Sequence, residues 1–165
     1  MSDSTVTTGE STVTTRTAAA TRWPAGVVGG LVGGAAMAVL ISLMNPPTLA
    51  VAIPSLYTLT PPPNGVLGWV VHLSHSAVLG VGFAAVARGS PVDCETTARS
   101  VVAGTGYGVV VWVVAAALLM PVWLGAVGSP ASPPVPNFAP PSLLWHVVFG
   151  AVLGAVYPAA VDRLQ

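Results

Sequence analysis

The sequence predicts an all-α integral membrane protein, a bundle of four transmembrane helices. The first observation is the placement of charge, since no Asp, Glu, Lys or Arg occurs from Trp23 to Ala87 or from Ser100 to Val161. The second is the composition: 53% of the residues are hydrophobic and 6% are charged, against about 25% charged residues in soluble domains. The third is that the apolar stretches divide into segments of roughly 20 residues, the length of a membrane-crossing helix.

The chain is predicted to have two parts. Residues 1–22 are rich in Ser and Thr and have too little apolar surface to offset the cost of ordering, so this tail is expected to be disordered. Residues 23–165 are expected to form the membrane domain. Its spans are predicted at residues 24–44, 66–87, 101–120 and 142–161.

Two long loops, residues 45–65 and 121–141, each end in a proline cluster and contain apolar stretches. Structureless loops of this length are unusual, so we expect them to fold as caps that contain a short helix. All five arginines lie outside both loops. Because positive residues stay inside, both termini are predicted to be cytoplasmic, and the protein is expected to be a multi-pass protein of the plasma membrane.

The two halves of the membrane domain resemble each other at a constant offset in the sequence. His72 corresponds to His146 and Gly80 to Gly154, and each half consists of a helix, a long loop and a second helix. Both halves start on the same side of the membrane. The sequence therefore predicts two parallel helix-hairpin repeats, related by a pseudo-twofold axis along the membrane normal.

Small residues recur at four-residue spacing along the spans, which lets helix backbones approach closely in a membrane. The glycines predicted to pack helix against helix are Gly26, Gly30, Gly34, Gly80, Gly104, Gly108, Gly150 and Gly154. These rows predict a tight bundle. A row of small residues that makes no contact within the bundle would serve to form a homo-oligomer.

The spans contain three histidines, His72, His75 and His146. His72 and His146 share a face with small residues four and eight positions later, so both are expected to point toward other helices. Met44 and Met120 end the other two spans at the same side of the membrane. One layer of the bundle can therefore bring three imidazoles and two thioethers together.

Three interpretations of this layer remain open. Each histidine can form an interhelical hydrogen bond as a neutral ring, with no cofactor. His72 and His146 can instead ligate the iron of a haem b, with neighbouring glycines leaving room for the macrocycle, although no Arg or Lys in the long loops would pair with the propionates. Copper(I) can be held by the imidazoles together with the thioethers of Met44 and Met120, although no carboxylate is present to orient the imidazoles.

The sequence argues against an enzyme. The spans hold no carboxylate, and there is no nucleotide-binding loop, Ser–His–acid set or metalloprotease helix motif. A net charge of zero argues against a nucleic-acid partner. We therefore expect a non-enzymatic protein of the lipid bilayer, acting as an accessory or self-associating subunit. The alternatives are a redox or metal-binding membrane protein and a small-solute permease.

The first span ends Leu43-Met44-Asn45-Pro46, and the last reads His146-Val-Val-Phe-Gly150-Ala-Val-Leu-Gly154-Ala-Val-Tyr157. In these segments the chain resembles uncharacterised four-helix prokaryotic membrane proteins, the YagU-like inner-membrane group and small haloarchaeal relatives. The resemblance covers roughly residues 25–160. It implies the fold and a membrane location, and it carries no activity.

Overall fold

The structure is a computed structural model of the 165-residue chain that describes residues 22–89 and 96–164. Four long helices in these residues are apolar enough to cross a membrane. They are α2 (Arg22–Met44), α4 (Gly65–Gly89), a continuous helix over Thr97–Ala126, and α7 (Pro140–Leu164). The prediction of an all-α protein with four helices long and apolar enough to span a membrane is confirmed for the described residues. Nearly all of the tail lies outside the described residues, as does Cys94, the one cysteine of the sequence.

The third long helix differs from the expected span because it continues beyond residue 120. It consists of α5 (Thr97–Val111), a π-helical segment η2 (Trp112–Leu119) and α6 (Met120–Ala126). Proline at position 121 has no N–H for the carbonyl of Ala117, its α-helical partner four residues earlier. That carbonyl instead accepts a hydrogen bond from the backbone N–H of Asn137 at 2.9 Å. The returning loop therefore replaces the bond that proline removes, and the helix continues.

The first long loop folds back on the membrane domain. It contains the π-helical segment η1 (Thr48–Ala52) and the short helix α3 (Ile53–Ser55), and both lie against α4. The N–H of Asn64 donates to the carbonyl of Ala50 at 2.8 Å, which ties the end of the loop to η1. Leu49 and Ile53 belong to the buried core. The loop is therefore an integral part of the fold.

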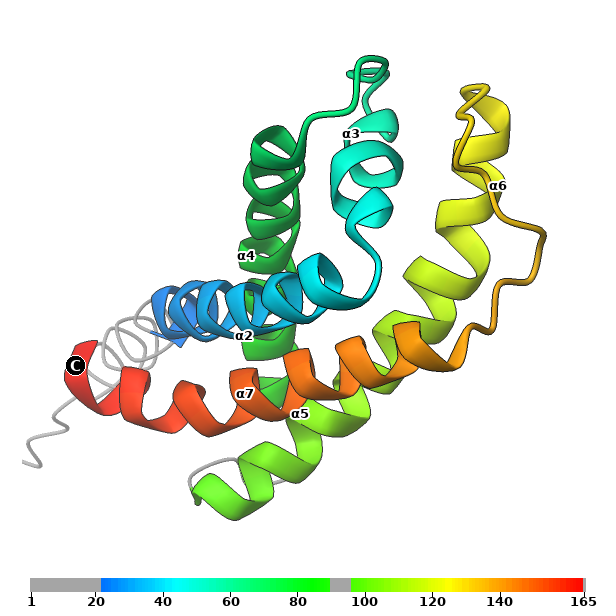
Figure 1. Cartoon of the computed structure of the whole chain (residues 1–165). Coiled ribbons are helices and arrows are strands. Elements are labelled where there is room, and N and C mark those ends of the chain that lie inside the picture. Colours follow the sequence, from blue (N-terminus) through cyan, green and yellow to red (C-terminus); the bar gives the residue numbers. More distant parts are fainter. Residues whose placement is uncertain (1–21, 90–95, 165) are drawn as a thin grey trace, which may run out of the picture.

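The helices α2 and α7 form the centre of the molecule. The helix α2 packs against both α4 and α7, and α5 packs against α7, whereas α4 and α5 barely touch. Figure 1 shows α2 and α7 side by side, with α4 and α5 crossing them. The four helices therefore do not pack evenly around a ring, because α4 and α5 approach each other at few points.

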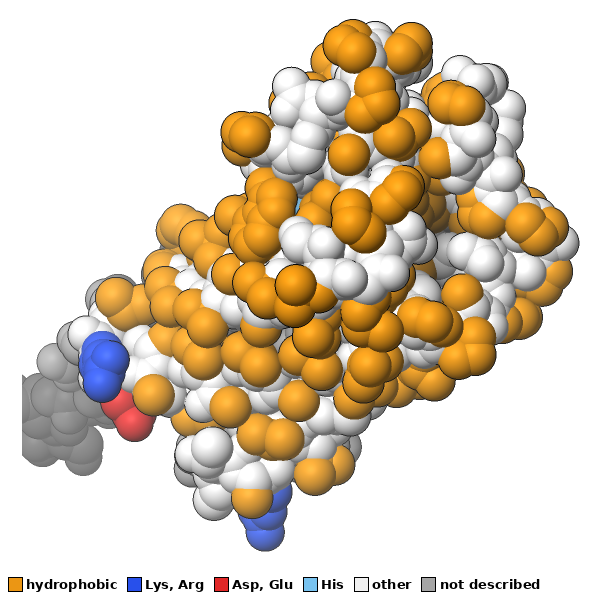
Figure 2. All heavy atoms as spheres, viewed as in Figure 1, with side chains coloured by type: hydrophobic (Ala, Val, Ile, Leu, Met, Phe, Trp, Pro, Cys, Tyr) orange, Lys and Arg blue, Asp and Glu red, His pale blue; other side chains and the backbone are white. Residues whose placement is uncertain are grey.

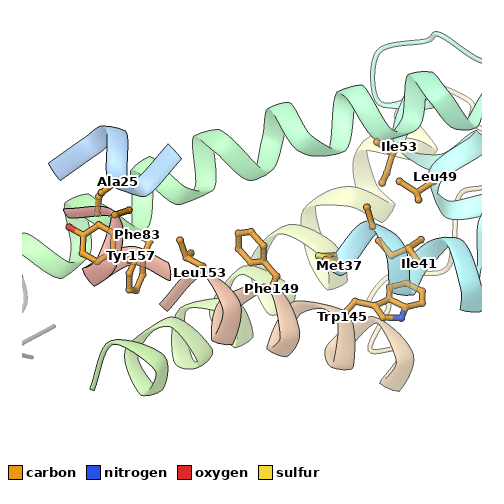
Figure 3. Close-up of a cluster of buried hydrophobic side chains, with 13 residues drawn as sticks. Ala25, Met37, Ile41, Leu49, Ile53, Phe83, Trp145, Phe149, Leu153 and Tyr157 are labelled. Carbon is orange, nitrogen blue, oxygen red and sulfur yellow. The ribbon is translucent and has the colours of Figure 1, made fainter. Parts of the chain in front are cut away.

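The hydrophobic core lies between α2, α4 and α7. Figure 3 shows it as a row of side chains that extends from Ala25 and Tyr157 to Ile41 and Trp145. At one end, the ring of Phe83 stands edge-on to the ring of Tyr157, with centroids 5.3 Å apart. This aromatic contact joins α4 to α7 at that end of the core.

Charged side chains gather at one end of the molecule, called here the charged end. Arg22 begins α2, Arg88 lies at the end of α4, Arg99 near the start of α5, and Asp162 and Arg163 near the end of α7. Figure 2 shows many hydrophobic side chains and no charged ones over the rest of the visible, described surface. Such a surface suits a lipid environment. The side of the membrane that the charged end faces stays a prediction.

The opposite end carries both long loops and is called here the loop end. There α3 and α6 project beyond the end of α2 and the start of α7 (Figure 1). The indole N–H of Trp123, in α6, donates to the carbonyl of Leu56, just after α3, at 2.9 Å. This bond joins the two projections across residues that are far apart in the sequence.

Candidate functional site

Glycines bring α2 directly against α4. A Cβ atom placed on Gly26 would overlap the carbonyl oxygen of Gly80, and one placed on Gly30 would overlap the carbonyl oxygen of Ser76. A Cβ atom on Gly34 would collide with the side chain of Ser76. Any larger residue at these positions would push the two backbones apart, so the crossing requires glycine.

The same kind of crossing joins α5 to α7. A Cβ atom on Gly104 would overlap the carbonyl oxygen of Gly150, and one on Gly150 would overlap that of Gly104. A Cβ atom on Gly154 would overlap the carbonyl oxygen of Ser100, a residue with no exposed surface. These glycines therefore pack helix against helix within one chain.

A second glycine face of α2 makes the central contact with α7. A Cβ atom on Gly33 would lie 2.7 Å from the carbonyl oxygen of Phe149, and one on Gly29 would lie 2.8 Å from a methyl carbon of Leu153. These two glycines lie beside the Gly26–Gly30–Gly34 row in the sequence but are not among the glycines predicted to pack helix against helix. Their signal is a four-residue spacing that repeats the Gly26–Gly30–Gly34 row on the adjacent face of the helix.

His72 takes part in the crossing of α2 and α4. Its Nε2 lies 3.1 Å from the carbonyl oxygen of Gly34, and the side chain is only 7% exposed. Because a carbonyl can only accept, Nε2 carries the hydrogen and Nδ1 is the nitrogen with the free lone pair. The hydroxyl of Ser76 donates to the backbone carbonyl of His72 at 2.8 Å. This histidine therefore links α4 to α2.

His146 occupies the corresponding place in α7, but its hydrogen bond is local. Its Nδ1 donates to the carbonyl of Ser142, one turn earlier in the same helix, at 2.7 Å. Its own carbonyl oxygen lies where a Cβ atom on Gly108 would be. The bond at Nδ1 leaves the lone pair of Nε2 free on a buried ring.

His75 has a different partner and a different environment. Its Nε2 lies 2.6 Å from the hydroxyl of Tyr57, and the two ring centroids are 5.6 Å apart. Tyr57 follows α3, so this pair ties the folded loop to α4. Within the described residues, no group of three or more His, Cys, Asp or Glu side chains is placed to hold a metal ion.

The two methionines proposed as ligands also have contacts of their own. The sulfur of Met44 accepts a hydrogen bond from the indole N–H of Trp145 at 3.2 Å. Met120 lines a cleft at the loop end. Coordination of haem or copper by these histidines and methionines stays a prediction.

A protein-family model matches residues 20–165, nearly the whole chain. The chain belongs to the family DUF6789. The function of that family is unknown, so membership assigns no activity or ligand. No curated protein and no solved structure matches the sequence. The resemblance to YagU-like proteins and haloarchaeal relatives stays a prediction.

In this DUF6789 protein, Tyr107 of α5 occupies the space between α5 and α4. Its hydroxyl donates to the carbonyl of Leu79 at 2.8 Å, and a Cβ atom on Gly82 would lie 2.7 Å from that hydroxyl. The ring also stands edge-on to Phe83, with centroids 5.6 Å apart. A tyrosine side chain therefore separates α5 from α4, whereas Gly33, at the corresponding position of the first half, allows α2 to contact α7 directly.

Gly106 differs from the other glycines in the interiors of the long described helices. A Cβ atom placed on it would have no neighbour within 4 Å, and the residue faces outward. It is flanked on this face by the exposed side chains of Val102, Val109 and Val110. Glycine in a helix interior costs about 1 kcal/mol relative to alanine. In this DUF6789 protein no contact within the described chain requires that glycine.

Proposed function

We propose that this DUF6789 protein is a non-enzymatic integral membrane subunit that self-associates through the outward face of α5. The observation that carries the proposal is the Gly106 notch, which is Gly106 together with Val102, Val109 and Val110. A glycine between larger side chains lets the backbone of another membrane helix approach closely, and this close packing drives association in lipid. A second copy of the chain is the proposed occupant of the notch.

The burial of the helices supports α5 as the associating element. In its most apolar stretch, the helix Thr97–Ala126 has 22% of its residues buried, against 28% in α4, 39% in α2 and 50% in α7. The long helix that contains α5 therefore has the smallest buried share of the four, which leaves it the most residues for contacts outside the chain.

The proposal includes the internal repeat, because the glycine contacts recur at the same offset in the sequence. The pair Gly30 and Ser76 corresponds to Gly104 and Gly150, both pairs being in contact. The contact of Gly26 with Gly80 likewise corresponds to the contact of Ser100 with Gly154. These matched contacts support two helix-hairpin units, α2 with α4 and α5 with α7.

The π-helical segment η2 supports the same interpretation. The offset between the halves is larger by one position at Pro46 and Pro121 than it is at Gly34 and Gly108. The second half therefore contains one additional residue between these points, where η2 lies. A π-helical turn encloses one residue more than an α-helical turn, so η2 can accommodate the additional residue without ending the helix.

Self-association is tested by energy transfer between donor-labelled and acceptor-labelled copies in liposomes at decreasing protein density. Gly106→Leu is expected to weaken association at least about tenfold, because the leucine fills the notch. Ala85→Leu, an equivalent enlargement at an exposed position of α4, is the matched control and is expected to associate like the original protein. Association that is absent in the original protein, or unchanged in Gly106→Leu, would refute the proposal.

A second candidate, a haem- or copper-binding protein, is favoured by one observation: the free Nε2 lone pair of buried His146. A hydrogen bond from Nδ1 to a carbonyl is a common way to orient a ligating imidazole. Against a haem, the backbones at both glycine crossings are in direct contact, so a flat macrocycle has no room between them there. This candidate therefore ranks second.

An absorption spectrum with elemental analysis separates the two candidates. The protein purified from its native membrane in mild detergent is expected to be colourless and free of metal. A Soret band that shifts on reduction, or near-stoichiometric copper, that is lost in His146→Ala would instead make the chain a cofactor protein.

A further inference from the structure

The loop end holds a cleft that the proposed self-association does not use. Its volume is about 340 Å³, and it lies between the end of α2, the start of α7 and the segments η1, η2 and α6. Its polar lining consists of Asn45, Thr48, Asn137 and Ser142, and Met120 and Trp145 contribute to its apolar lining. The volume falls within the range of small-molecule sites, which combine an apolar lining with a few polar groups.

Hydrogen bonds hold the walls of this cleft in place. The backbone N–H of Asn137 is bonded to the carbonyl of Ala117, which fixes the loop segment that contributes Asn137 to the cleft. The indole of Trp145 is fixed by its bond to the sulfur of Met44, and Trp145 is only 5% exposed. The walls are thus formed without a ligand, which reduces the entropic cost of binding.

The chemistry of the lining selects an uncharged ligand. The side chains offer amides and hydroxyls, which donate and accept hydrogen bonds, and no lining residue carries a charge. Every charged residue that the structure describes lies at the opposite, charged end. A phosphate, carboxylate or ammonium group in the cleft would lose water without gaining a counter-charge, and this is costly.

A second hollow provides room for an apolar chain. Its volume is about 460 Å³, it shares Pro47 and Ala131 with the cleft, and its remaining lining includes Val51 and three prolines. Because α2 ends at Met44 and α7 begins at Pro140, the cleft lies near the membrane–water interface when these helices span the bilayer. The polar groups of the cleft and the mainly apolar lining of the hollow match an amphiphile, which has a polar head and an apolar chain.

We propose that the cleft binds the head group of an uncharged amphiphilic lipid, whose head carries carbonyl or hydroxyl oxygens, and that the adjoining hollow holds part of its apolar chain. Asn137 and Asn45 are the proposed hydrogen-bonding residues for the head. An isoprenoid quinone and a diacylglycerol both have this chemistry. The proposal does not depend on self-association, since the Gly106 notch and the cleft involve different residues.

The test uses the full-length protein in nanodiscs and native mass spectrometry. A short-chain menaquinone, a diacylglycerol and the anionic lipid phosphatidylglycerol are titrated separately. We expect about one bound menaquinone or diacylglycerol per chain, and the one that binds more tightly identifies the class of lipid that the cleft accepts. Phosphatidylglycerol is expected to bind at least tenfold more weakly. The variant Asn45→Leu/Asn137→Leu is expected to lose affinity for the uncharged lipid about tenfold or more, because two hydrogen bonds are lost.

Ser74→Ala is the matched control, since Ser74 is exposed on α4, is not part of the cleft lining and bonds only within its own helix. It is expected to bind like the original protein. If the double variant does not fold, as judged by circular dichroism, Thr48→Val at the same cleft replaces it and is expected to weaken binding severalfold. The proposal is overturned if neither uncharged lipid binds, if phosphatidylglycerol binds equally well, or if the folded cleft variant binds like the original protein.

Discussion

Gly104→Leu is expected to prevent the membrane domain from folding stably, whereas Gly106→Leu, two residues later in the same helix, is expected to leave it folded. The side chain at position 104 would have to occupy the place of the Gly150 carbonyl oxygen, which is backbone and cannot rotate away. Overpacking typically costs 1–3 kcal/mol, and here the clash with backbone puts the expected loss at or above about 3 kcal/mol. At position 106 the new side chain meets nothing within the described chain.

Thermal unfolding in mild detergent, followed by circular dichroism at less than one chain per micelle, measures this difference. Gly106→Leu is expected to change the free energy of unfolding by less than about 1 kcal/mol, because leucine is a better helix former than glycine. Gly30→Leu is expected to behave like Gly104→Leu, since the two glycines make corresponding contacts in the two halves. Similar stability of Gly104→Leu and Gly106→Leu would contradict the proposed role of the crossings, and a tolerant Gly30→Leu would contradict the repeat.

The position of the long helices could be predicted from the sequence because one physical constraint dominates. A segment without charge over the length of a bilayer is readily stable there only as a helix. This constraint places α2, α4 and α7 close to their expected bounds. It contains no information on which helices become neighbours, so the sparse contact between α4 and α5 could not be foreseen.

The candidate site was predictable in part. Four-residue spacing identifies glycine faces on each helix, but it does not assign each face a partner. Gly106 lies between Gly104 and Gly108 in the sequence, yet it faces outward, while its neighbours face α7. The hydrogen-bond partners of His72, His75 and His146 could not be predicted from the sequence either. Tyr57, for example, reaches His75 only because a long loop folds back onto α4.

The end of the third long helix shows a limit of another kind. Proline in a helix pattern normally predicts an end or a kink, because it removes one hydrogen bond. In this chain the lost bond is replaced by the N–H of Asn137, sixteen positions after Pro121 in the sequence. A local pattern does not contain such a distant donor, so α6 could not be separated from the loop by sequence alone.

Asn137→Pro is expected to destabilise the protein by about 1–3 kcal/mol, which is the cost of leaving a buried polar group without a partner. The substitution removes the N–H that bonds to the carbonyl of Ala117, a residue with no exposed surface. Asn137→Ala keeps that N–H and is expected to unfold at nearly the same temperature as the original protein. Comparing the two variants therefore separates the contribution of the Asn137 side chain to stability from that of its backbone N–H.

A double-mutant cycle with Pro121→Ala shows whether the lost bond is the cause. Alanine at position 121 supplies the N–H that an α-helix would direct to the carbonyl of Ala117, so Asn137→Pro is expected to cost at least about 1 kcal/mol less in that background. Any strain that a proline introduces at position 137 is present in both backgrounds and cancels. Equal costs in the two backgrounds would show that strain in the loop, and not the carbonyl of Ala117, accounts for the effect. A smaller cost beside Pro121→Ala would instead identify the bond from Asn137 as the contact that lets a membrane helix continue through a proline.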